Sequence, residues 1–289
     1  MATSPISADD TFVRVERDGA IAIITLDRPH RRNAVVNAMG RELESAFLSA
    51  GTDSAVRVIV LCGAGGHFCA GGDMERLADI RDRGITALSV PPEADNPRFA
   101  AMTDAPPGTR TRYLLPMAVP QPVIAAIGGA CAGAGLVLAT ACDLRVAAHD
   151  ARFAAGFGRR GLIAENGIAV ILPHLVGHAA AADLLIRGHR IDAYEARRIG
   201  LVGDVVPPGE LLSRASNMAR EIAREVSPRS ATVIKRQLQA TIHDLGRSLD
   251  RAAAELRAAI VTPDFAEGIA AFVEKRAPVF ADRASQATA

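Results

Sequence analysis

Two glycine-rich loops carry the sequence features that are best suited to chemistry. The first, HFCAGGD at 67–73, follows a strand-like segment and precedes a helical pattern that begins near Met74. The second, GGACAGAG at 128–135, also joins a strand-like segment to a helical one. Amides at the start of a helix lack intrahelical partners and face negative charge. Either loop alone is consistent with a tight structural turn. Two loops whose amides converge on one carbonyl oxygen would form an oxyanion hole.

A third candidate is the acidic residue Glu165 in the sequence RRGLIAENG at 159–167. The residues just before it are apolar, and burial among apolar groups raises the pKa of a carboxyl, as suits a general base. The alternative is capping of the apolar helix that starts near Gly167, because acidic groups stabilise that end of a helix. We favour catalysis because the carboxylate accompanies two oxyanion loops.

A dinucleotide site is a competing interpretation of the second loop. The sequence GAG at 133–135 matches part of a GxGxxG fingerprint, but Leu138 stands where the third glycine belongs. The sequence also lacks an acidic residue at the end of a second strand, where a ribose partner is expected. We therefore place dinucleotide binding below the oxyanion hole.

The elements that would position these loops alternate between strands and helices. Apolar segments at 12–16 and 20–26 flank Asp18-Gly19, which is a strong hairpin signal. The spacing then predicts a parallel core with right-handed crossovers. The expected strands are 58–61, 123–127 and 144–147, and the expected helices are 39–50, 74–83 and 136–142. Amphipathic patterns predict further helices at 179–186, 193–199, 210–226, 229–241, 247–260 and 264–274.

The domain organisation follows from these patterns. We expect a flexible N-terminus at 1–10, an α/β core at 11–205 and a helical C-terminal region at 206–289. The proline-rich and polar segment 84–108 has no clear periodicity and is expected to be a lid or an insertion.

Composition restricts the possible partners. The formal net charge of +1, with 49% hydrophobic and 22% charged residues, gives no global field toward nucleic acid or an anionic membrane. The uncharged stretch 113–142 is interrupted by prolines and glycines, so we expect a buried strand and helix there and no membrane partner. The four cysteines lack metal-ligand spacing, and we expect no metal site. The first residues lack the features of a secretory signal, so a cytoplasmic location is expected.

Several motifs, in this order, resemble the crotonase (enoyl-CoA hydratase/isomerase) superfamily over about residues 13–280. The motifs are RPHRRNAV at 28–35, HFCAGGD at 67–73, QPVIAAIGGACAGAG at 121–135, CDLRVAA at 142–148, RRGLIAENG at 159–167, ARRIGLVGDVV at 196–206 and EGIAAFVEKRAP at 267–278.

The resemblance implies a spiral of ββα units with a helical C-terminal region used for trimerisation, and a homotrimer or homohexamer. It implies an acyl-CoA thioester substrate, with no cofactor beyond its CoA moiety, and oxyanion amides at Gly72 and Ala134. An alanine at 134 keeps the amide donor if its φ is tolerable. The residues that it places near CoA are His30, Arg31, Arg32, Ala34, Ala70, Asp73 and Met74, with Phe272 and Lys275 contributed by a neighbouring subunit. For Arg31 and Arg32, a solvated surface pair is an equally good interpretation.

The sequence departs from the hydratases of this superfamily at two positions. The two glutamates that hold water in those enzymes correspond here to Val137 and Phe157, which cannot accept a proton. Glu165 stands where isomerases of the superfamily have an acidic residue, and one carboxylate can move a proton between two carbons. The resemblance therefore favours double-bond isomerisation of an enoyl-CoA, with Glu165 as acid and base.

Two other functions stay open. One is hydration or thioester hydrolysis with a non-standard base. The other is a non-catalytic acyl-CoA-binding or RNA-binding protein of the same fold. The resemblance includes a member that binds RNA through lysine-rich helices, whereas this chain contains only Lys235 and Lys275, so we expect no nucleic acid partner.

Overall fold

The computed structural model describes residues 11–84, 109, 111–242 and 245–280, with backbone alone for 245–248. The expected flexible N-terminus at 1–10 lies outside the described residues. So does the expected lid or insertion, apart from Gly84, which ends a helix.

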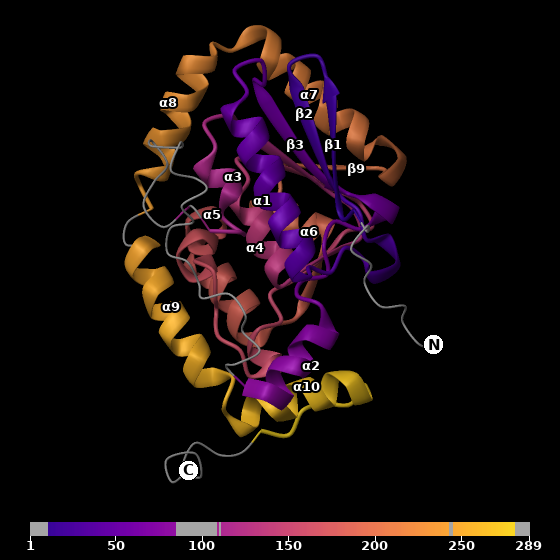
Figure 1. Ribbon diagram of the computed structural model, residues 1–289, viewed down its shortest axis with the longest axis vertical. Coiled ribbons are helices and arrows are strands. Elements are labelled where there is room, and N and C mark those ends of the chain that lie inside the picture. Colours follow the sequence, from indigo (N-terminus) through magenta and orange to yellow (C-terminus); the bar gives the residue numbers. More distant parts are fainter. Residues whose placement is uncertain (1–10, 85–108, 110, 243–244, 281–289) are drawn as a thin grey trace.

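A six-stranded sheet forms the centre of the molecule (Figure 1). Its strands lie in the order β1 (Val13–Asp18), β2 (Ile21–Leu26), β3 (Val58–Gly63), β4 (Val123–Ile127), β6 (Leu144–Ala148) and β9 (Asp204–Val206). The β1–β2 pair is the predicted antiparallel hairpin, and Gly19 adopts a left-handed φ of 58° in its turn. The other neighbours are parallel, as the strand and helix alternation predicts.

A second, three-stranded sheet was not predicted from the sequence. It consists of β5 (Ala130–Ala132), β7 (Arg152–Ala154) and β8 (Arg190–Asp192). Each strand has three residues, which is too short for an alternating pattern to identify it. Strand β5 is part of the second glycine-rich loop, so this sheet fixes the backbone of that loop.

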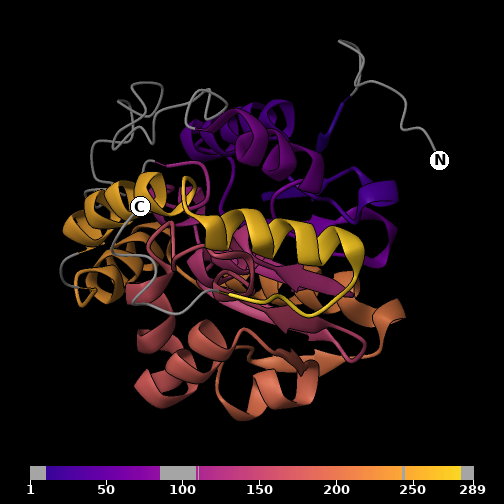
Figure 2. The same ribbon diagram turned by 90° about the horizontal axis from the view of Figure 1, so that it is seen from below.

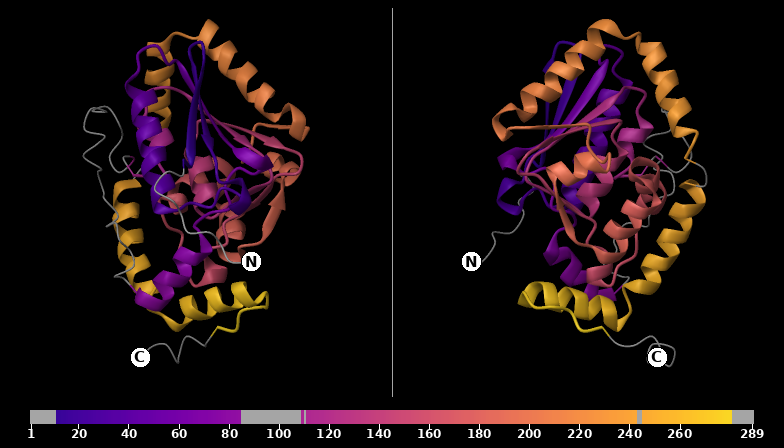
Figure 3. Two further views of the ribbon diagram at one scale, coloured as in Figure 1. Left: turned by 45° about the vertical axis from the view of Figure 1, so that its right-hand side comes forward. Right: turned by 180° about the vertical axis from the view of Figure 1, so that it is seen from behind.

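Helices cover both faces of the central sheet. One face packs in the main core against α1 (Asn37–Thr52), α3 (Leu115–Ala118), α4 (Ala134–Ala141) and α5 (Ile168–Ala182). The other face packs against α7 (Leu211–Glu225), which crosses it in the view from behind (Figure 3, right). Small residues on α7, Ala215 and Ala219, lie on Val58, Val60 and Ile124 of the sheet. The short helix α6 (Ala193–Arg198) precedes β9.

The predicted helical C-terminal region is confirmed as α7, α8 (Pro228–Gln239), α9 (Leu245–Ala259) and α10 (Pro263–Glu274). Helices α8 and α9 run along one side of the molecule in Figure 1, and α10 crosses its underside in Figure 2. There α10 packs against α2 (Met74–Arg83) and the turn Gly158–Arg160. The C-terminal helices thereby close one side of the space next to α2.

The stretch 113–142 forms α3, β4, β5 and α4, which confirms the expected buried strand and helix. A different segment, Ile168–Arg187, is long and apolar enough to span a membrane by length and composition, and 28% of its apolar window is buried. Gly177, with φ 77° and ψ 158°, interrupts the helical backbone within this segment.

Candidate active site

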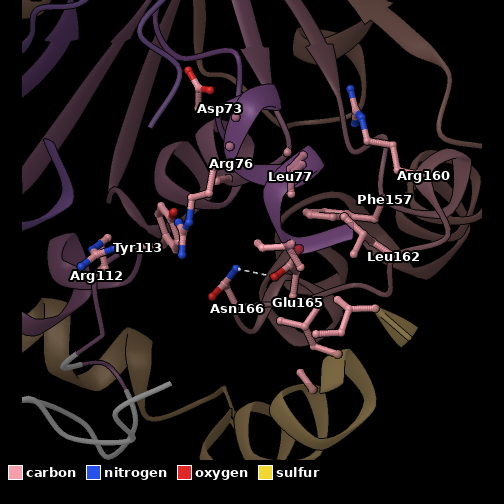
Figure 4. Close-up of a pocket in the computed structure, with 18 of the residues that line it drawn as sticks. Asp73, Arg76, Leu77, Arg112, Tyr113, Phe157, Arg160, Leu162, Glu165 and Asn166 are labelled. Atoms are coloured by element: carbon pink, nitrogen blue, oxygen red, sulfur yellow. Dashed lines mark hydrogen bonds between the residues drawn. The ribbon is translucent and has the colours of Figure 1, made fainter. Parts of the chain in front are cut away.

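A pocket of about 620 Å³ lies between the two glycine-rich loops and the C-terminal helices (Figure 4). One wall contains Gly72 and Ala134, and Glu165 with Asn166 forms another part of the lining. Helix α2 contributes Arg76, Leu77 and Ile80, α9 contributes Leu249, Ala252, Ala253 and Leu256, and α10 contributes Phe265 and Phe272.

Backbone hydrogen bonds hold the two loops together. The Cys69 amide donates to the Ala130 carbonyl at 2.9 Å, and the Ala132 amide donates to the Cys69 carbonyl at 2.9 Å. Gly71, with a φ of 103°, lies so close that a Cβ there would be 2.9 Å from the Ala132 carbonyl oxygen. Only glycine satisfies both the dihedral angle and this approach. The first loop therefore places Gly72 beside the N-terminus of α4.

The amides of Gly72 and Ala134 are available to a ligand. Within the part of the chain that the structure describes, neither amide donates a backbone hydrogen bond. Ala134 is the first residue of α4, and the left-handed φ of 51° falls on Gly133 before it. Ala134 itself has no positive φ, so an alanine is tolerated at this position and keeps its amide donor. Two free amides that line one pocket are the donors an oxyanion hole requires.

A buried ion pair fixes the end of the first loop. The Arg28 guanidinium donates to the Asp73 carboxylate at 2.5 Å, and each side chain is 5% exposed. The other carboxylate oxygen accepts from the Glu75 amide, so Asp73 also caps α2. The Val35 amide donates to the Gly71 carbonyl, and the Asp73 amide donates to the Val35 carbonyl. These two bonds form a parallel bridge between Val35 and Gly72.

Glu165 lies in the pocket lining immediately before α5. Desolvation by burial raises the pKa of its carboxyl from the ordinary 4.5 to about 7, although Arg76 and the Asn166 side chain favour the ionised form. The Asn166 amide nitrogen donates to its Oε2 at 3.5 Å, the bond that is drawn dashed in Figure 4. The N-cap of α5 is Gly167, and the Glu165 carboxylate accepts from Asn166 and not from an amide of the helix, so it does not cap α5 through a hydrogen bond.

The two positions that correspond to hydratase glutamates are apolar and buried. Val137 is fully buried in α4, and Phe157 is 5% exposed in the lining near Leu162. Two further pocket carboxylates are engaged in ion pairs, Asp73 with Arg28 and Glu44 with Arg112 at 3.1 Å.

Most of the residues that were predicted to bind CoA line this pocket, namely Arg31, Ala34, Ala70, Asp73, Met74 and Phe272. Arg31 pairs with Glu75 at 2.6 Å, so it is not a purely solvated residue. Phe272 lines the pocket of its own chain, where the Arg160 guanidinium lies 4.7 Å from its ring centre.

Three of the residues that were predicted to bind CoA are placed elsewhere. His30, Arg32 and Lys275 are exposed and do not line the pocket. Arg32 and Lys275 both adopt left-handed φ values at the ends of helical turns, and the Arg32 carbonyl accepts from the Ala70 amide of the first loop. Lys275 was expected to act from a neighbouring subunit, and that role stays a prediction, as do the CoA contacts of His30 and Arg32.

Sequence reasoning missed several polar residues of the pocket lining that lie outside the two loops. These are Glu44 from α1, Arg76 from α2, and Thr111, Arg112 and Tyr113 from the segment before α3. Glu44 and Arg76 have an ordinary surface spacing within their helices, and only the packing of α1 against α3 brings the segment 111–113 beside them. The isolated charge of Glu44 on the buried face of α1 was the one available signal.

The histidine and cysteine side chains near the loops are structural. His67 Nδ1 accepts from the Ala130 amide at 3.1 Å, so this side chain joins the two loops. Cys69 and Cys131 are buried and free, and burial raises the pKa of both thiols. Among the described residues, no three His, Cys, Asp or Glu side chains are grouped to hold a metal ion.

Comparison with known proteins identifies the family. Residues 16–283 match the family described as enoyl-CoA hydratase/isomerase. The chain is 33% identical over 275 residues to a probable enoyl-CoA hydratase, echA8, of Mycobacterium tuberculosis, with 94% of this chain and 98% of that protein covered. It is 30% identical over 269 residues to a 1,2-epoxyphenylacetyl-CoA isomerase of Escherichia coli, with 93% and 98% covered.

Solved structures show the same fold. An enoyl-CoA hydratase/isomerase from Pseudoalteromonas atlantica superposes with a TM-score of 0.79 at 27% identity, covering 94% of this chain and all of that chain. A carnitinyl-CoA hydratase from Mycobacterium avium superposes with a TM-score of 0.77 at 31% identity, covering 93% and 98%. With its crotonase fold and two loops of free amides, this chain belongs to the enoyl-CoA hydratase/isomerase family.

Proposed function

We propose that this protein isomerises the double bond of an enoyl-CoA, with Glu165 as the single acid and base. The observation that carries the proposal is the position of Glu165, which shares one pocket with the free amides of Gly72 and Ala134. A carboxyl with a pKa of about 7 is well matched to both removing and returning a proton near neutral pH.

One carboxyl group can carry out both proton transfers of this isomerisation. The Glu165 carboxylate removes a proton from C2 of a 3-enoyl-CoA, and the electrons of that C–H bond form a dienolate. The amides of Gly72 and Ala134 donate to the dienolate oxygen, where negative charge develops. The protonated Glu165 then returns the proton to C4, and the double bond is left between C2 and C3. No water and no second carboxylate take part.

Hydration is the competing function, because relatives such as echA8 are named probable enoyl-CoA hydratases. Isomerisation is favoured by the residues in this pocket. Val137 and Phe157 offer no proton acceptor, and the pocket carboxylates Glu44 and Asp73 are held in ion pairs. The remaining carboxylate of the lining, Asp250 of α9, is exposed to solvent and lacks the burial that raises the pKa of Glu165. The relative named as an isomerase shows that the family also includes isomerases.

The proposal is tested by supplying a 3-enoyl-CoA and a 2-enoyl-CoA separately to wild-type protein and to Glu165→Gln. Wild type is expected to convert the first substrate into the conjugated thioester, followed by its ultraviolet absorbance. Glu165→Gln is expected to lose at least 100-fold in kcat, as follows from removal of a general base. The control is Glu221→Gln, at an exposed site on α7, which should retain wild-type rates.

Deuterium at C2 makes the test sharper. A single carboxyl that carries the proton from C2 to C4 should transfer part of the label within the molecule. Robust hydration of the 2-enoyl-CoA that survives Glu165→Gln would reject Glu165 as the base and favour a hydratase with another base.

The oligomeric state and location belong to the same proposal. A homotrimer or homohexamer is supported by exposed apolar side chains on the C-terminal helices, among them Ile234 and Leu238 of α8 and Val273 of α10, and the cytoplasm is retained as the proposed location. Light scattering on the purified protein tests the assembly.

A further inference from the structure

The pocket contains buried hydrogen-bonding atoms that have no partner within the protein. Among the described residues, Arg76 Nε, Thr111 Oγ1 and Arg160 Nε are buried, unpartnered and belong to side chains that line this pocket. Each of the three atoms can donate a hydrogen bond. Buried polar atoms in native proteins are nearly always satisfied, so a group of unpartnered donors in one pocket indicates a ligand with acceptor atoms.

Arg76 is the group with the strongest claim to such a ligand. It is the third residue of α2, so it lies at the N-terminal end of this helix, shortly after Gly72 in the chain. Its side chain extends from α2 toward Tyr113, over the region where Glu165 and Asn166 lie (Figure 4). Arg76 lowers the pKa of both Glu165 and Tyr113, which places its charge close to both groups.

Two other arginines of α2 form ion pairs, whereas, among the described residues, Arg76 does not. Arg81 and Arg83 are paired with Asp82 and Asp79 on the same helix. Arg76 forms no ion pair with any residue in the described ranges. A guanidinium that is partly removed from water without a hydrogen-bonded anion is unfavourable, and a bound carboxylate would offset that cost through charge-assisted bonds.

Four other arginines belong to the lining. Arg31 is paired with Glu75 at 2.6 Å and Arg257 is exposed to solvent, so neither leaves an unpaired charge in a buried place. Arg112 is paired with Glu44 at 3.1 Å, so its charge is balanced inside the protein. Arg160 donates to the Gly156 carbonyl at 3.1 Å, lies over the Phe272 ring and points away from Glu165 in Figure 4. Thr111, next to Arg112 in the chain, adds an unpartnered hydroxyl to the pocket lining.

We propose that the acyl group of the substrate carries its own carboxylate, which Arg76 binds and Thr111 assists. The proposal rests on the proposed function for one point, the placement of the thioester at the amides of Gly72 and Ala134. Arg76 lines the same pocket as the two amides, from the first turn of the helix that follows Gly72, so the far end of a short acyl chain placed there can reach its guanidinium. The substrate class is then the mono-CoA thioester of a short dicarboxylic acid, unsaturated between the two ends.

Binding of saturated ligands tests this proposal independently of turnover. The ligands are saturated acyl-CoA thioesters of four, five and six carbons that end in a carboxylate, each compared with the thioester of equal length that ends in a methyl group. Dissociation constants are measured by calorimetry for wild type, Arg76→Gln and Arg76→Lys. The matched control is Arg83→Gln, on the same helix but exposed and paired with Asp79.

For at least one chain length, wild type is expected to bind the carboxylate ligand about tenfold tighter than the methyl ligand, the size of one charge-assisted bond. Arg76→Gln should reduce the ratio of the two dissociation constants to about one, Arg76→Lys should retain part of it, and Arg83→Gln should leave it unchanged. Equal affinities at all three lengths in wild type, or a preference that persists in Arg76→Gln, would overturn the proposal. Because these ligands cannot isomerise, the result does not depend on whether Glu165 is the base.

Discussion

Arg28 and Asp73 form a buried ion pair, with 2.5 Å between Arg28 Nη1 and Asp73 Oδ2, directly beside the Gly72 amide. Arg28 follows β2, whereas Asp73 caps α2, so the pair joins the end of a strand to the start of a helix. Arg28 also donates to the Ala34 carbonyl at 3.2 Å, next to the Val35–Gly72 bridge. The position of one candidate oxyanion amide therefore depends on an ion pair remote in sequence.

Replacement of Arg28 by methionine is expected to destabilise the protein by about 3–5 kcal/mol, because the Asp73 carboxylate would stay buried without its partner. Urea denaturation measures the free energy of unfolding. Arg17→Met is the control, since the Arg17–Asp53 pair is exposed and should contribute less than about 1 kcal/mol. Equal effects of the two substitutions would show that burial does not govern the Arg28 pair.

Ala134→Pro removes one candidate oxyanion donor without disturbing the helix. Ala134 is the first residue of α4, where proline is favoured, and its amide has no backbone partner within the described ranges. We expect a loss of about 100-fold to 1,000-fold in kcat, the size seen for one such donor. Ala134→Ser keeps the amide and is expected to retain most of the activity. Thermal melting checks that both variants fold, and full activity of a folded Ala134→Pro protein would reject this amide as a donor.

The rate should depend on pH through Glu165. Its pKa of about 7 means that the free enzyme loses its base as the pH falls below 7, so kcat/KM for the 3-enoyl-CoA should fall about tenfold per pH unit there. An inflection near the ordinary value of 4.5 would show that the base is an unperturbed carboxylate.

Arg76→Gln should shift this pH profile in a defined direction. Arg76 favours the ionised form of Glu165, so its removal raises the pKa of Glu165 and moves the inflection to higher pH. Arg76→Lys retains a positive charge and should shift the inflection less. A shift to lower pH in Arg76→Gln would contradict the assigned electrostatic contact.

The strands and helices that hold the loops could be predicted because their patterns are local. The hairpin around Gly19, the strand Val123–Ile127 and the helix Met74–Arg83 follow from apolar periodicity and turn residues within a few positions. The short strands of the second sheet could not be predicted, because a strand of three residues is too short to show an alternating pattern. Their pairing also joins segments that are distant in sequence, Ala130–Ala132 and Arg152–Ala154.

The same distinction holds within the site. Gly72, Ala134 and Glu165 were identified because each lies in a motif that is continuous in sequence. Arg76 and Tyr113 were missed because their approach depends on how α2 packs beside the segment before α3. His30 and Arg32 were assigned to CoA from their motif; both are exposed outside the pocket lining, whereas Arg31 between them lines it.

The two lysines of the chain offer a final comparison, because one is buried and the other exposed. Lys235 Nζ lies 2.8 Å from Asp143 Oδ2 and donates to the Gln121 carbonyl at 2.8 Å, which fastens α8 to the start of β4. Burial lowers the pKa of Lys235, whereas the Asp143 carboxylate opposes that shift.

Lys235→Met is expected to cost about 3–5 kcal/mol of stability, because the Asp143 carboxylate and the Gln121 carbonyl would lose their shared donor. Lys275→Met should have little effect, since Lys275 is exposed at the end of α10. Amine-specific labelling of the native protein gives an independent measure, because Lys275 should react while Lys235 reacts only after unfolding. Rapid labelling of Lys235 in native protein would show that α8 detaches from the sheet, and the ion pair would then not anchor the C-terminal helices.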